Sequence, residues 1–429
     1  MDYLRGLIGL VVLIAIAFAF SANKKAIDWK LVGVGVLLQL IFAVLITKVE
    51  FVNTAFSWVS DMFVTFLGFA GKGANFLFGD LTEVSKFGFI FAFQVLPTVI
   101  FFSCISAGLY YLGILQKIVF VIAWVMSKTM RLSGAESLSA AGNIFLGQTE
   151  APLLVRPFVK NMTTSELMCL MTGGMATIAG GVLAGYVTFL GGDDPVEKAK
   201  YASYLLSASI MNAPAAIVLS KIVLPEDRPE DIDTDIKVSK DSMGVNLIDA
   251  LARGASDGVG LAINIAGMLL AFIAIIYALN WILVDGIGAY TGLNEFVKES
   301  TDGTFQGFSL EYILGQVFRG FAFVMGVEWA ETIKVGSLLG QKVVLNEFVG
   351  YLSLAEMKSQ GLLTQKSIVI STYALCGFAN FSSIAIQIGG IGGMAPNRQG
   401  DLSRLGMKAL FAATLATMMT ATIAGALLG

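Results

Sequence analysis

Two acidic residues stand inside apolar stretches, and their positions indicate the chemistry that this chain could perform. Glu150 lies within the run 143–157 (NIFLGQTEAPLLVRP), and Glu347 lies within the run 346–349 (NEFV). A charged side chain at the centre of a membrane span costs on the order of 3 kcal/mol or more, so it is retained where it has a partner or a function. One such carboxylate could simply cap a helix or pair with a lysine. Two of them in corresponding segments favour a binding role.

A second group of polar residues adds amides, hydroxyls and an aromatic ring. The run 376–383 (CGFANFSS) carries Phe378, Asn380 and Ser383, and the last two, three residues apart, share one face of a helix. Carboxylates accept hydrogen bonds from hydroxyl groups, and amides can match the edge of a base. The combination suits a neutral, polyhydroxylated ligand with one flat face. An anionic ligand fits poorly, because no lysine or arginine in an apolar segment is placed to receive it.

Small residues interrupt two of the apolar segments. The run 173–181 (GGMATIAGG) breaks one of them, and the run 376–383 breaks the other. Irregular backbone at membrane depth is tolerated where it is buried in protein or lines a cavity, and its free carbonyl groups can act as ligands. Close packing of helices is the alternative interpretation, and we prefer it for Gly181 and Gly185, which form a small-xxx-small pair.

The elements that position these residues must lie in lipid. The 429 residues are 56% hydrophobic and 14% charged, with a mean hydropathy of +0.77, whereas soluble domains carry about 25% charged residues. The net charge of −3 gives no indication of nucleic acid binding. The chain has no histidine, and its three cysteines form no metal or disulfide pattern. An intramembrane enzyme is therefore disfavoured, while a secondary transporter for a solute or ion fits the polar residues.

The hydropathy pattern predicts eight spanning helices, because a span needs about 20 mostly apolar residues. They cover residues 4–20, 31–48, 88–114, 167–190, 201–224, 259–284, 367–391 and 405–428. The stretch 51–78 predicts an interfacial helix. Two other stretches, 135–159 and 329–354, are interrupted at 147–152 and at 340–342. The predicted fold class is thus an all-α polytopic membrane protein with two re-entrant helical hairpins and two broken helices, 167–190 and 367–391.

The order of elements occurs twice, as a hairpin, a glycine-broken helix and a closing helix. Basic residues near helix ends, such as Lys24, Lys25 and Arg404, gather on the cytoplasmic side if both termini lie outside the cell. The two halves then start on opposite faces, and such inverted repeats are a transporter plan with its site at the bilayer midplane. The predicted divisions are scaffold helices 1–115, a first transport half 116–224, a cytoplasmic linker 225–257 and a second transport half 258–429.

The polar motifs resemble those of the concentrative nucleoside transporters, specifically the bacterial sodium-coupled group. The similar runs are 143–157 for that family's first hairpin, 346–349 for its second hairpin, 376–380 with 382–385 for its seventh helix, and 89–93 with 96–98 for its third. The resemblance extends over residues 1–429 and implies a symporter that imports nucleosides on the sodium gradient, not an enzyme. A proton-coupled nucleoside symporter is the alternative, but proton-coupled relatives depart from the run QTEAP, which this chain keeps.

The resemblance also implies a role for each residue of the site. Those expected to contact the nucleobase are Gln148, Thr149, Glu150, Val182 and Phe378, and those expected to hold the ribose are Glu347, Asn380 and Ser383. The sodium ligands it implies are Asn143, Leu146, Thr177 and Ile178, of which Leu146 and Ile178 offer only their carbonyls. Relatives have serine at the position of Thr177, so the hydroxyl is kept. The family further implies a homotrimer in the cell (inner) membrane that takes a nucleoside such as uridine.

Overall fold

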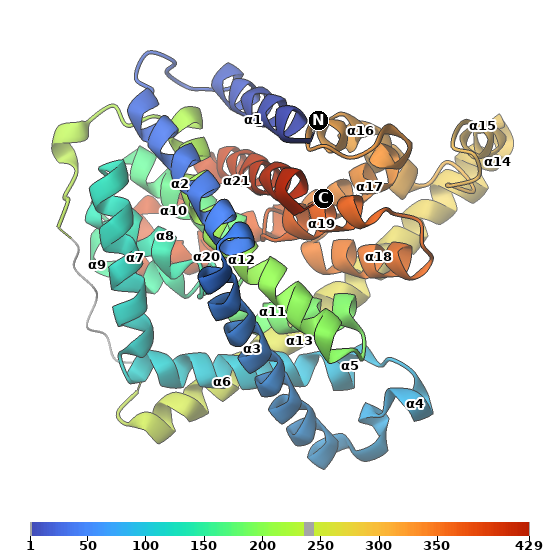
Figure 1. The fold of residues 1–429 in the computed structure, drawn as a ribbon, viewed down its shortest axis with the longest axis horizontal. Helices are drawn as coiled ribbons and strands as arrows, with labels where there is room; N and C mark the ends of the chain where they lie inside the picture. Colours follow the sequence, from blue (N-terminus) through green and yellow to red (C-terminus); the bar gives the residue numbers. More distant parts are fainter. Residues whose placement is uncertain (1, 236–243, 429) are drawn as a thin grey trace.

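The computed structural model describes residues 2–235 and 244–428, and helices are the regular elements of these residues (Figure 1). The amino-terminal part contains α1 (Asp2–Ala19), α2 (Trp29–Lys48), α3 (Glu50–Phe78), the short α4 (Val84–Phe87) and α5 (Phe91–Gln94), α6 (Leu96–Tyr111) and α7 (Ile114–Met130). The first hairpin and the helices α8 to α12 come next in the chain, and α13 (Leu247–Asn280) follows them. α13 continues into a π-helical segment (Trp281–Gly288), and α14 (Ala289–Thr291), α15 (Leu293–Ser300) and α16 (Leu310–Val324) come next.

A hairpin, a broken helix and a long helix follow one another twice in the chain. In the first half these are α8 (Gly134–Gly142) with α9 (Arg156–Val159), then α10 (Thr164–Ala176) with α11 (Gly180–Gly191), then α12 (Pro195–Val223). In the second half they are α17 (Thr332–Val344) with α18 (Glu347–Ser359), then α19 (Gln365–Leu375) with α20 (Phe381–Met394), then α21 (Gln399–Leu428). The predicted all-α polytopic fold class, with its hairpins and broken helices, is confirmed.

Eight helices of the described chain are long and apolar enough to cross a membrane, but they are not the same eight as predicted. Glu50–Thr82 belongs to this set, and the predicted helix 367–391 does not, since it consists of two separate helices, α19 and α20, with residues 376–380 between them. The helix expected at 51–78 is present as α3, and its position along the membrane surface stays a prediction. α13 begins at Leu247, inside the segment 225–257 that is predicted to be a cytoplasmic linker, and this division of the chain stays a prediction.

The second hairpin is broken at a different place from the one predicted. The sequence 340–342 is helical, and the break lies at Leu345 and Asn346, where the Asn346 side chain caps the start of α18 by accepting from the backbone N–H of Val349 at 3.0 Å. Gly340 instead allows close helix packing, because a Cβ atom there would lie 2.5 Å from the Cβ atom of Leu314 on α16.

The hairpins and broken helices form the packed centre of the protein. In the most apolar window of the broken helix 164–191 and of α12, 89% of the residues are buried, whereas in those of α3 and α13 only 17% are. The poorly buried helices therefore lie on the outside. α13 packs along α6, where a Cβ atom at Gly254 would lie 2.4 Å from the Cβ atom of Ala107. The exposed side chains of these outer helices are largely apolar, as the hydrophobic composition of a membrane protein predicts.

Both ends of the chain lie on the same side of the helix bundle, and Figure 1 shows them close together. α1 packs against α21, and a Cβ atom at Gly6 would lie 2.8 Å from the Cβ atom of Ala426. Asp2 forms an ion pair with Lys366 at the start of α19. The structure thus agrees with termini on one common side, while the assignment of that side to the exterior stays a prediction.

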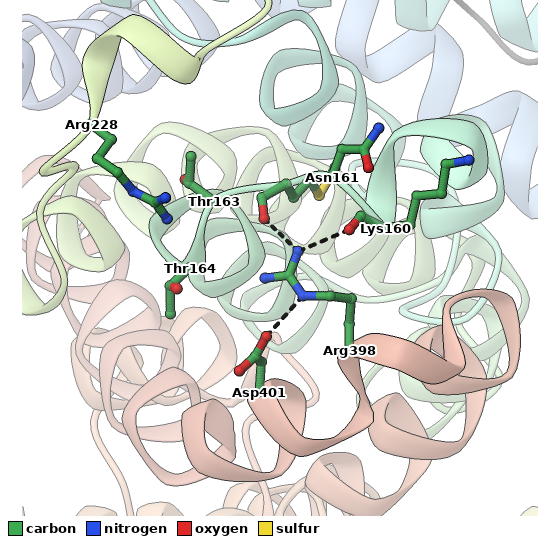
Figure 2. A pocket seen from close by; sticks show the side chains of 8 residues that line it. Lys160, Asn161, Thr163, Thr164, Arg228, Arg398 and Asp401 are labelled. Atoms are coloured by element: carbon green, nitrogen blue, oxygen red, sulfur yellow. Dashed lines mark hydrogen bonds and ion pairs between the residues drawn. The ribbon is translucent and has the colours of Figure 1, made fainter.

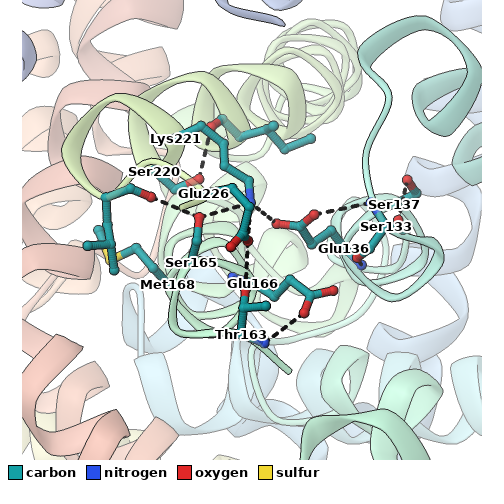
Figure 3. A network of polar contacts seen from close by, with 12 residues as sticks. Ser133, Glu136, Ser137, Thr163, Ser165, Glu166, Met168, Ser220, Lys221 and Glu226 are labelled. Atoms are coloured by element: carbon teal, nitrogen blue, oxygen red, sulfur yellow. Dashed lines mark hydrogen bonds and ion pairs between the residues drawn. The ribbon is translucent and has the colours of Figure 1, made fainter. Parts of the chain in front are cut away.

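A buried polar network fastens the start of the first hairpin to α10 and α12 (Figure 3). The Lys221 ammonium lies 2.5 Å from the Glu136 carboxylate and donates to the Ser165 hydroxyl at 3.0 Å. The Thr163 hydroxyl donates to Glu226 at 2.6 Å. Breaking a buried ion pair by removing one partner costs about 3–5 kcal/mol. The network therefore holds α8 of the first hairpin, α10 and α12 together as one unit.

A polar recess of about 600 Å³ lies at the beginning of α10, away from the hairpin tips (Figure 2). Its lining residues are Lys160, Asn161, Met162, Thr163, Thr164, Arg228, Arg398 and Asp401. The Arg398 guanidinium donates to the carbonyl oxygens of Lys160 and Met162 at 3.3 and 2.5 Å and to the Asp401 carboxylate at 2.8 Å. Arg398 thus connects the segment before α21 to the end of the first hairpin.

Candidate functional site

The two broken helices cross at their breaks, which creates the centre of the candidate site. The backbone N–H of Phe378 donates to the carbonyl oxygen of Thr177 at 3.3 Å. Gly377 makes this approach possible, because a Cβ atom there would lie 2.8 Å from the carbonyl oxygen of Ala176. Two segments that are far apart in the sequence therefore present their unpaired backbone groups to the same place.

A single buried asparagine on α12 joins the two breaks. The Asn212 side-chain nitrogen donates to the carbonyl oxygen of Ala176 at 2.7 Å and to that of Cys376 at 2.8 Å. These carbonyls lie at the ends of α10 and α19, where the helical hydrogen-bond pattern stops and leaves acceptors unpaired. Asn212 was not among the predicted site residues, and its role is to hold the two breaks in register.

We expect Asn212→Leu to lower the free energy of unfolding by about 2–4 kcal/mol, because each buried carbonyl left without a donor costs about 1–3 kcal/mol. Thermal unfolding of the purified protein in detergent measures this effect. Ser220→Ala on the same helix is the control, because the Ser220 hydroxyl donates to Ile217 of its own helix. Equal melting temperatures for Asn212→Leu and the wild type would show that Asn212 does not support the breaks.

The second hairpin contributes a carboxylate that two neighbours orient. Glu347 is the first residue of α18, and its Oε1 atom accepts from the Tyr186 hydroxyl at 2.9 Å, while its Oε2 atom accepts from the Asn380 amide at 2.9 Å. The Asn380 Oδ1 atom in turn caps α20 by accepting from the backbone N–H of Ser383 at 2.9 Å. The structure thus brings together the three residues to which the resemblance assigns the ribose.

The first hairpin reaches the same place through Gln148. Its Nε2 atom donates to the Ser383 hydroxyl at 3.0 Å, so the two hairpins meet at α20. Its Oε1 atom accepts from Gln387, also on α20, at 3.2 Å. Gln148, Ser383 and Gln387 are all buried. Buried polar groups keep hydrogen-bond partners, so these side chains can give up their mutual hydrogen bonds only to a ligand that offers equivalent ones.

The other residues expected to contact the base lie around this point with different degrees of exposure. Thr149 is exposed and faces α20, since a Cβ atom at Gly390 would lie 3.4 Å from its methyl group. Glu150 is half-buried, and its Oε2 atom is buried without a hydrogen-bond partner among the described residues. Val182 is buried in the first turn of α11, and Phe378 is half-buried in the crossing.

The residues expected to bind sodium lie where the tip of the first hairpin docks on the break between α10 and α11. The backbone N–H of Gly180 donates to the carbonyl oxygen of Phe145 at 3.2 Å, which joins the two segments. All four expected ligands are buried: Asn143, Leu146, Thr177 and Ile178. The Asn143 Oδ1 atom has no hydrogen-bond partner among the described residues. Buried oxygen atoms of this kind are the ligands that hard cations prefer.

A buried lysine in the second hairpin was not anticipated from the sequence. Lys342 is almost fully buried, and its ammonium group donates to the carbonyl oxygen of Ala374 at 2.8 Å and to the Thr417 hydroxyl at 2.9 Å. The prediction that no basic residue is placed to receive an anionic ligand is not contradicted by Lys342, whose ammonium group is bonded to protein acceptors. Because both acceptors belong to the protein, Lys342 connects the hairpin to α19 and α21, and it is not directed at a ligand by these contacts.

Four residues of this site escaped the sequence analysis, namely Tyr186, Asn212, Lys342 and Gln387. Each is a polar residue inside an apolar helix, and for Asn212, Lys342 and Gln387 this position is itself a signal that could have been used. Tyr186 gives no comparable signal, because a tyrosine in an apolar helix is common.

The fold and the site define a class. Discontinuous helices whose breaks meet two hairpin tips, with buried polar groups at the meeting point, are the arrangement of secondary transporters. The protein is therefore a multi-pass membrane transporter.

Comparison with known proteins gives the family. The profile described as Na+ dependent nucleoside transporter C-terminus matches residues 204–425, its N-terminus counterpart matches residues 8–81, and the profile described as Nucleoside recognition matches residues 92–193. An uncharacterized transporter of Haemophilus influenzae is 44% identical, with 100% of this chain and 99% of that protein covered. Sodium/nucleoside cotransporter 1 of Mus musculus is 38% identical over 98% of this chain and 63% of its own length.

A solved structure, described as CNTnw in an inward-facing substrate-bound state, has a TM-score of 0.89 and 39% identity, and the match covers 100% of this chain and 98% of that one. The chain belongs to the family of sodium-dependent nucleoside transporters. Members of this family are transporters and not enzymes, and their profiles name Na+ as the coupling ion.

Proposed function

We propose that this protein imports nucleosides together with sodium. The observation that carries the proposal is the buried cluster in which Gln148, Glu347, Asn380 and Ser383 meet at the crossing of the broken helices. The amides and the hydroxyl can both donate and accept hydrogen bonds, and the carboxylate accepts them. This combination binds a neutral, hydroxyl-rich ligand better than a charged one. The family membership supports the same conclusion.

The cluster has a sugar side and a base side. On the sugar side, Glu347 and Asn380 bind ribose hydroxyls, because a carboxylate held by Tyr186 and Asn380 retains lone pairs for further donors. Ser383 belongs to both sides through its contact with Gln148. On the base side, the groups that bind the nucleobase are Gln148, Thr149, Glu150, Val182 and Phe378.

Sodium binds between the first hairpin and the break of α10 and α11. The unpaired Oδ1 atom of Asn143 supports this assignment, because a cation satisfies a buried acceptor as a hydrogen-bond donor would. The Thr177 hydroxyl donates its hydrogen to the carbonyl oxygen of Gly173 at 2.9 Å, which leaves its lone pairs free for a cation. The carbonyl oxygens of Leu146 and Ile178 complete the ligand set.

One sodium ion is sufficient to drive accumulation. A charge that moves through 100 mV gains about 2.3 kcal/mol, and a tenfold sodium gradient adds about 1.4 kcal/mol. The sum of about 3.7 kcal/mol supports a gradient of a neutral nucleoside of roughly 500-fold. No second ion is needed.

The cellular arrangement follows the same proposal. The protein is a homotrimer in the inner membrane with both termini outside the cytoplasm, and the hairpins move with the broken helices against a scaffold that includes α1, α2 and α6. The low burial of α3 and α13 supports this arrangement, because helices exposed in one subunit are available to lipid and to neighbouring subunits.

The experiment that tests the proposal measures uptake of labelled uridine by proteoliposomes with sodium or choline outside. We expect uptake that depends on inward sodium and that continues in the presence of a protonophore. Uptake that is unchanged in choline but collapses with a protonophore would identify the ion as a proton. In that case the function would be that of a proton-coupled nucleoside symporter, and Glu150 would be the candidate proton carrier.

A second prediction concerns the base. Gln148→Ala should change the relative inhibition of uridine uptake by cytidine and adenosine, because Gln148 contacts the base and not the sugar. Competition by unlabelled nucleosides and by free ribose measures this preference. Gln360→Ala is the control, since Gln360 is an exposed glutamine that directly follows α18. Equal weakening of all nucleosides by Gln148→Ala would remove Gln148 from base recognition.

A further inference from the structure

A second buried glutamine, Gln387 on α20, forms a hydrogen bond with Gln148, and the proposed function assigns it no contact with the nucleoside or with sodium. Its side chain is 1% exposed. The Nε2 atom of Gln387 donates to the carbonyl oxygen of Met171 on α10 at 3.1 Å and to the Oε1 atom of Gln148 at 3.2 Å. Gln387 thus connects the backbone of the broken helix to the side chain that we assign to base recognition.

The Met171 contact determines the direction of the whole chain of hydrogen bonds. A backbone carbonyl only accepts, so the nitrogen of the Gln387 amide must face Met171. The same nitrogen then faces Gln148, which can answer only with its oxygen, because two amide nitrogens would place donor against donor. Gln148 is therefore held with its own nitrogen toward Ser383, as the 3.0 Å contact shows.

The packing around these amides leaves them little freedom to turn. A Cβ atom at Gly174 would lie 2.6 Å from the Nε2 atom of Gln387 and 3.1 Å from the Cβ atom of Gln148. The Oε1 atom of Gln387 is buried and has no hydrogen-bond partner in residues 2–235 and 244–428. In this part of the chain, therefore, the orientation of the Gln387 amide is set by the two acceptors that face its nitrogen, on Met171 and Gln148.

We propose that Gln387 is a positioning residue that fixes the orientation of the Gln148 amide and thereby determines which bases are preferred. The inference rests on the proposed function, because it requires Gln148 to contact the base. With its oxygen engaged by Gln387, Gln148 offers N–H to a ligand. The transporter then favours a base whose facing edge carries an acceptor, and a freely turning Gln148 would lose this preference.

The test replaces Gln387 with methionine, which keeps the size of the side chain and removes the donors. For a panel of uridine, cytidine, inosine and adenosine, we expect the ratio of Vmax/KM between the best and the poorest substrate to shrink by about fivefold, the effect of one lost hydrogen bond. The ratio of uridine to 2′-deoxyuridine should stay constant, because the sugar side is untouched. In a Gln148→Ala background, Gln387→Met should produce no further change in the base ratios.

Gln39 provides a matched control, because it is a fully buried glutamine on α2 whose Nε2 atom donates to the Thr420 hydroxyl at 2.8 Å, away from the site. Gln39→Met should leave the base ratios unchanged. If Gln387→Met does not assemble, Gln387→Glu has the same shape with at most one donor and should shift the ratios in the same direction.

Equal loss for all four nucleosides, or effects of Gln387→Met and Gln148→Ala that simply add, would overturn the inference and leave Gln387 with a packing role. A wild-type protein that takes up none of the nucleosides would instead contradict the proposed function. The two outcomes can be told apart by the wild-type protein. It takes up nucleosides if only the inference about Gln387 fails, and it takes up none if the proposed function fails.

Discussion

Glu347→Gln is expected to lower uridine uptake roughly 10- to 100-fold while the protein still inserts and assembles. The Glu347 carboxylate accepts from both Tyr186 and Asn380, and an amide cannot do so at both positions, because its nitrogen only donates. Loss of a hydrogen bond to a buried charged group costs about 1.5–3 kcal/mol, and about 1.4 kcal/mol corresponds to a factor of ten. Initial rates of uptake by proteoliposomes at saturating sodium measure the loss.

Glu356→Gln is the matched control for this experiment. Glu356 lies on the same helix, α18, but it is exposed, and its carboxylate accepts from Gln360. Its replacement should leave uptake near the wild-type rate, since an exposed substitution away from the site has little effect on stability. Near-normal uptake by Glu347→Gln would remove Glu347 from the ribose site.

Thr177→Val and Asn143→Ala are expected to raise the sodium concentration for half-maximal uptake by roughly 3- to 10-fold, the effect of one lost ligand of hydrogen-bond strength. Both positions are buried, and among the four expected ligands only these two have side-chain oxygens to lose. Sodium titrations of uridine uptake measure the shift. At high sodium the maximal rate should recover, because the residues that bind the nucleoside are unchanged.

Thr172→Val is the matched control for sodium binding. Thr172 is a buried threonine on α10, the helix that ends just before Thr177. Its hydroxyl donates to the carbonyl oxygen of Met168 at 2.7 Å, as the Thr177 hydroxyl does to that of Gly173 at 2.9 Å. Thr172 lies in the helical part of α10 and is not one of the expected sodium ligands. If Thr172→Val and Thr177→Val shift the sodium titration equally, or if sodium does not rescue Thr177→Val, the hydroxyl has a packing role only.

The expected sodium site and the expected nucleoside site are connected at the crossing of the broken helices. Thr177, an expected sodium ligand, accepts through its carbonyl from the N–H of Phe378, an expected contact of the base. We therefore expect a cation that binds at one break to order the other as well. Since linkage is reciprocal for binding, uridine should bind more weakly to Thr177→Val at low sodium and normally at high sodium.

The sequence by itself determined the class of protein, most of the helices and most of the candidate residues. Charged residues and glycine runs in apolar segments are rare, because lipid penalises them, so Glu150, Glu347 and the run 376–383 are recognisable without a structure. The helix pattern also follows from local hydropathy, since each span must satisfy its own backbone. Contacts that are local in the sequence, such as the cap of α20 by Asn380, belong to the same category.

Other features depend on which helices meet, and only the tertiary structure decided them. The break of the second hairpin lies at Leu345, because Gly340 packs against α16 and does not interrupt its helix. Lys342 is buried because α19 and α21 supply its acceptors.

The contacts that complete the site connect residues far apart in the chain. Asn212 joins carbonyls at positions 176 and 376, and Gln387 orients Gln148 from the opposite half. A hydrogen bond between distant segments depends on helix crossings, and hydropathy along the chain contains no information about them. The identity of the polar residues was therefore readable from the sequence, whereas their partners and orientation required the fold.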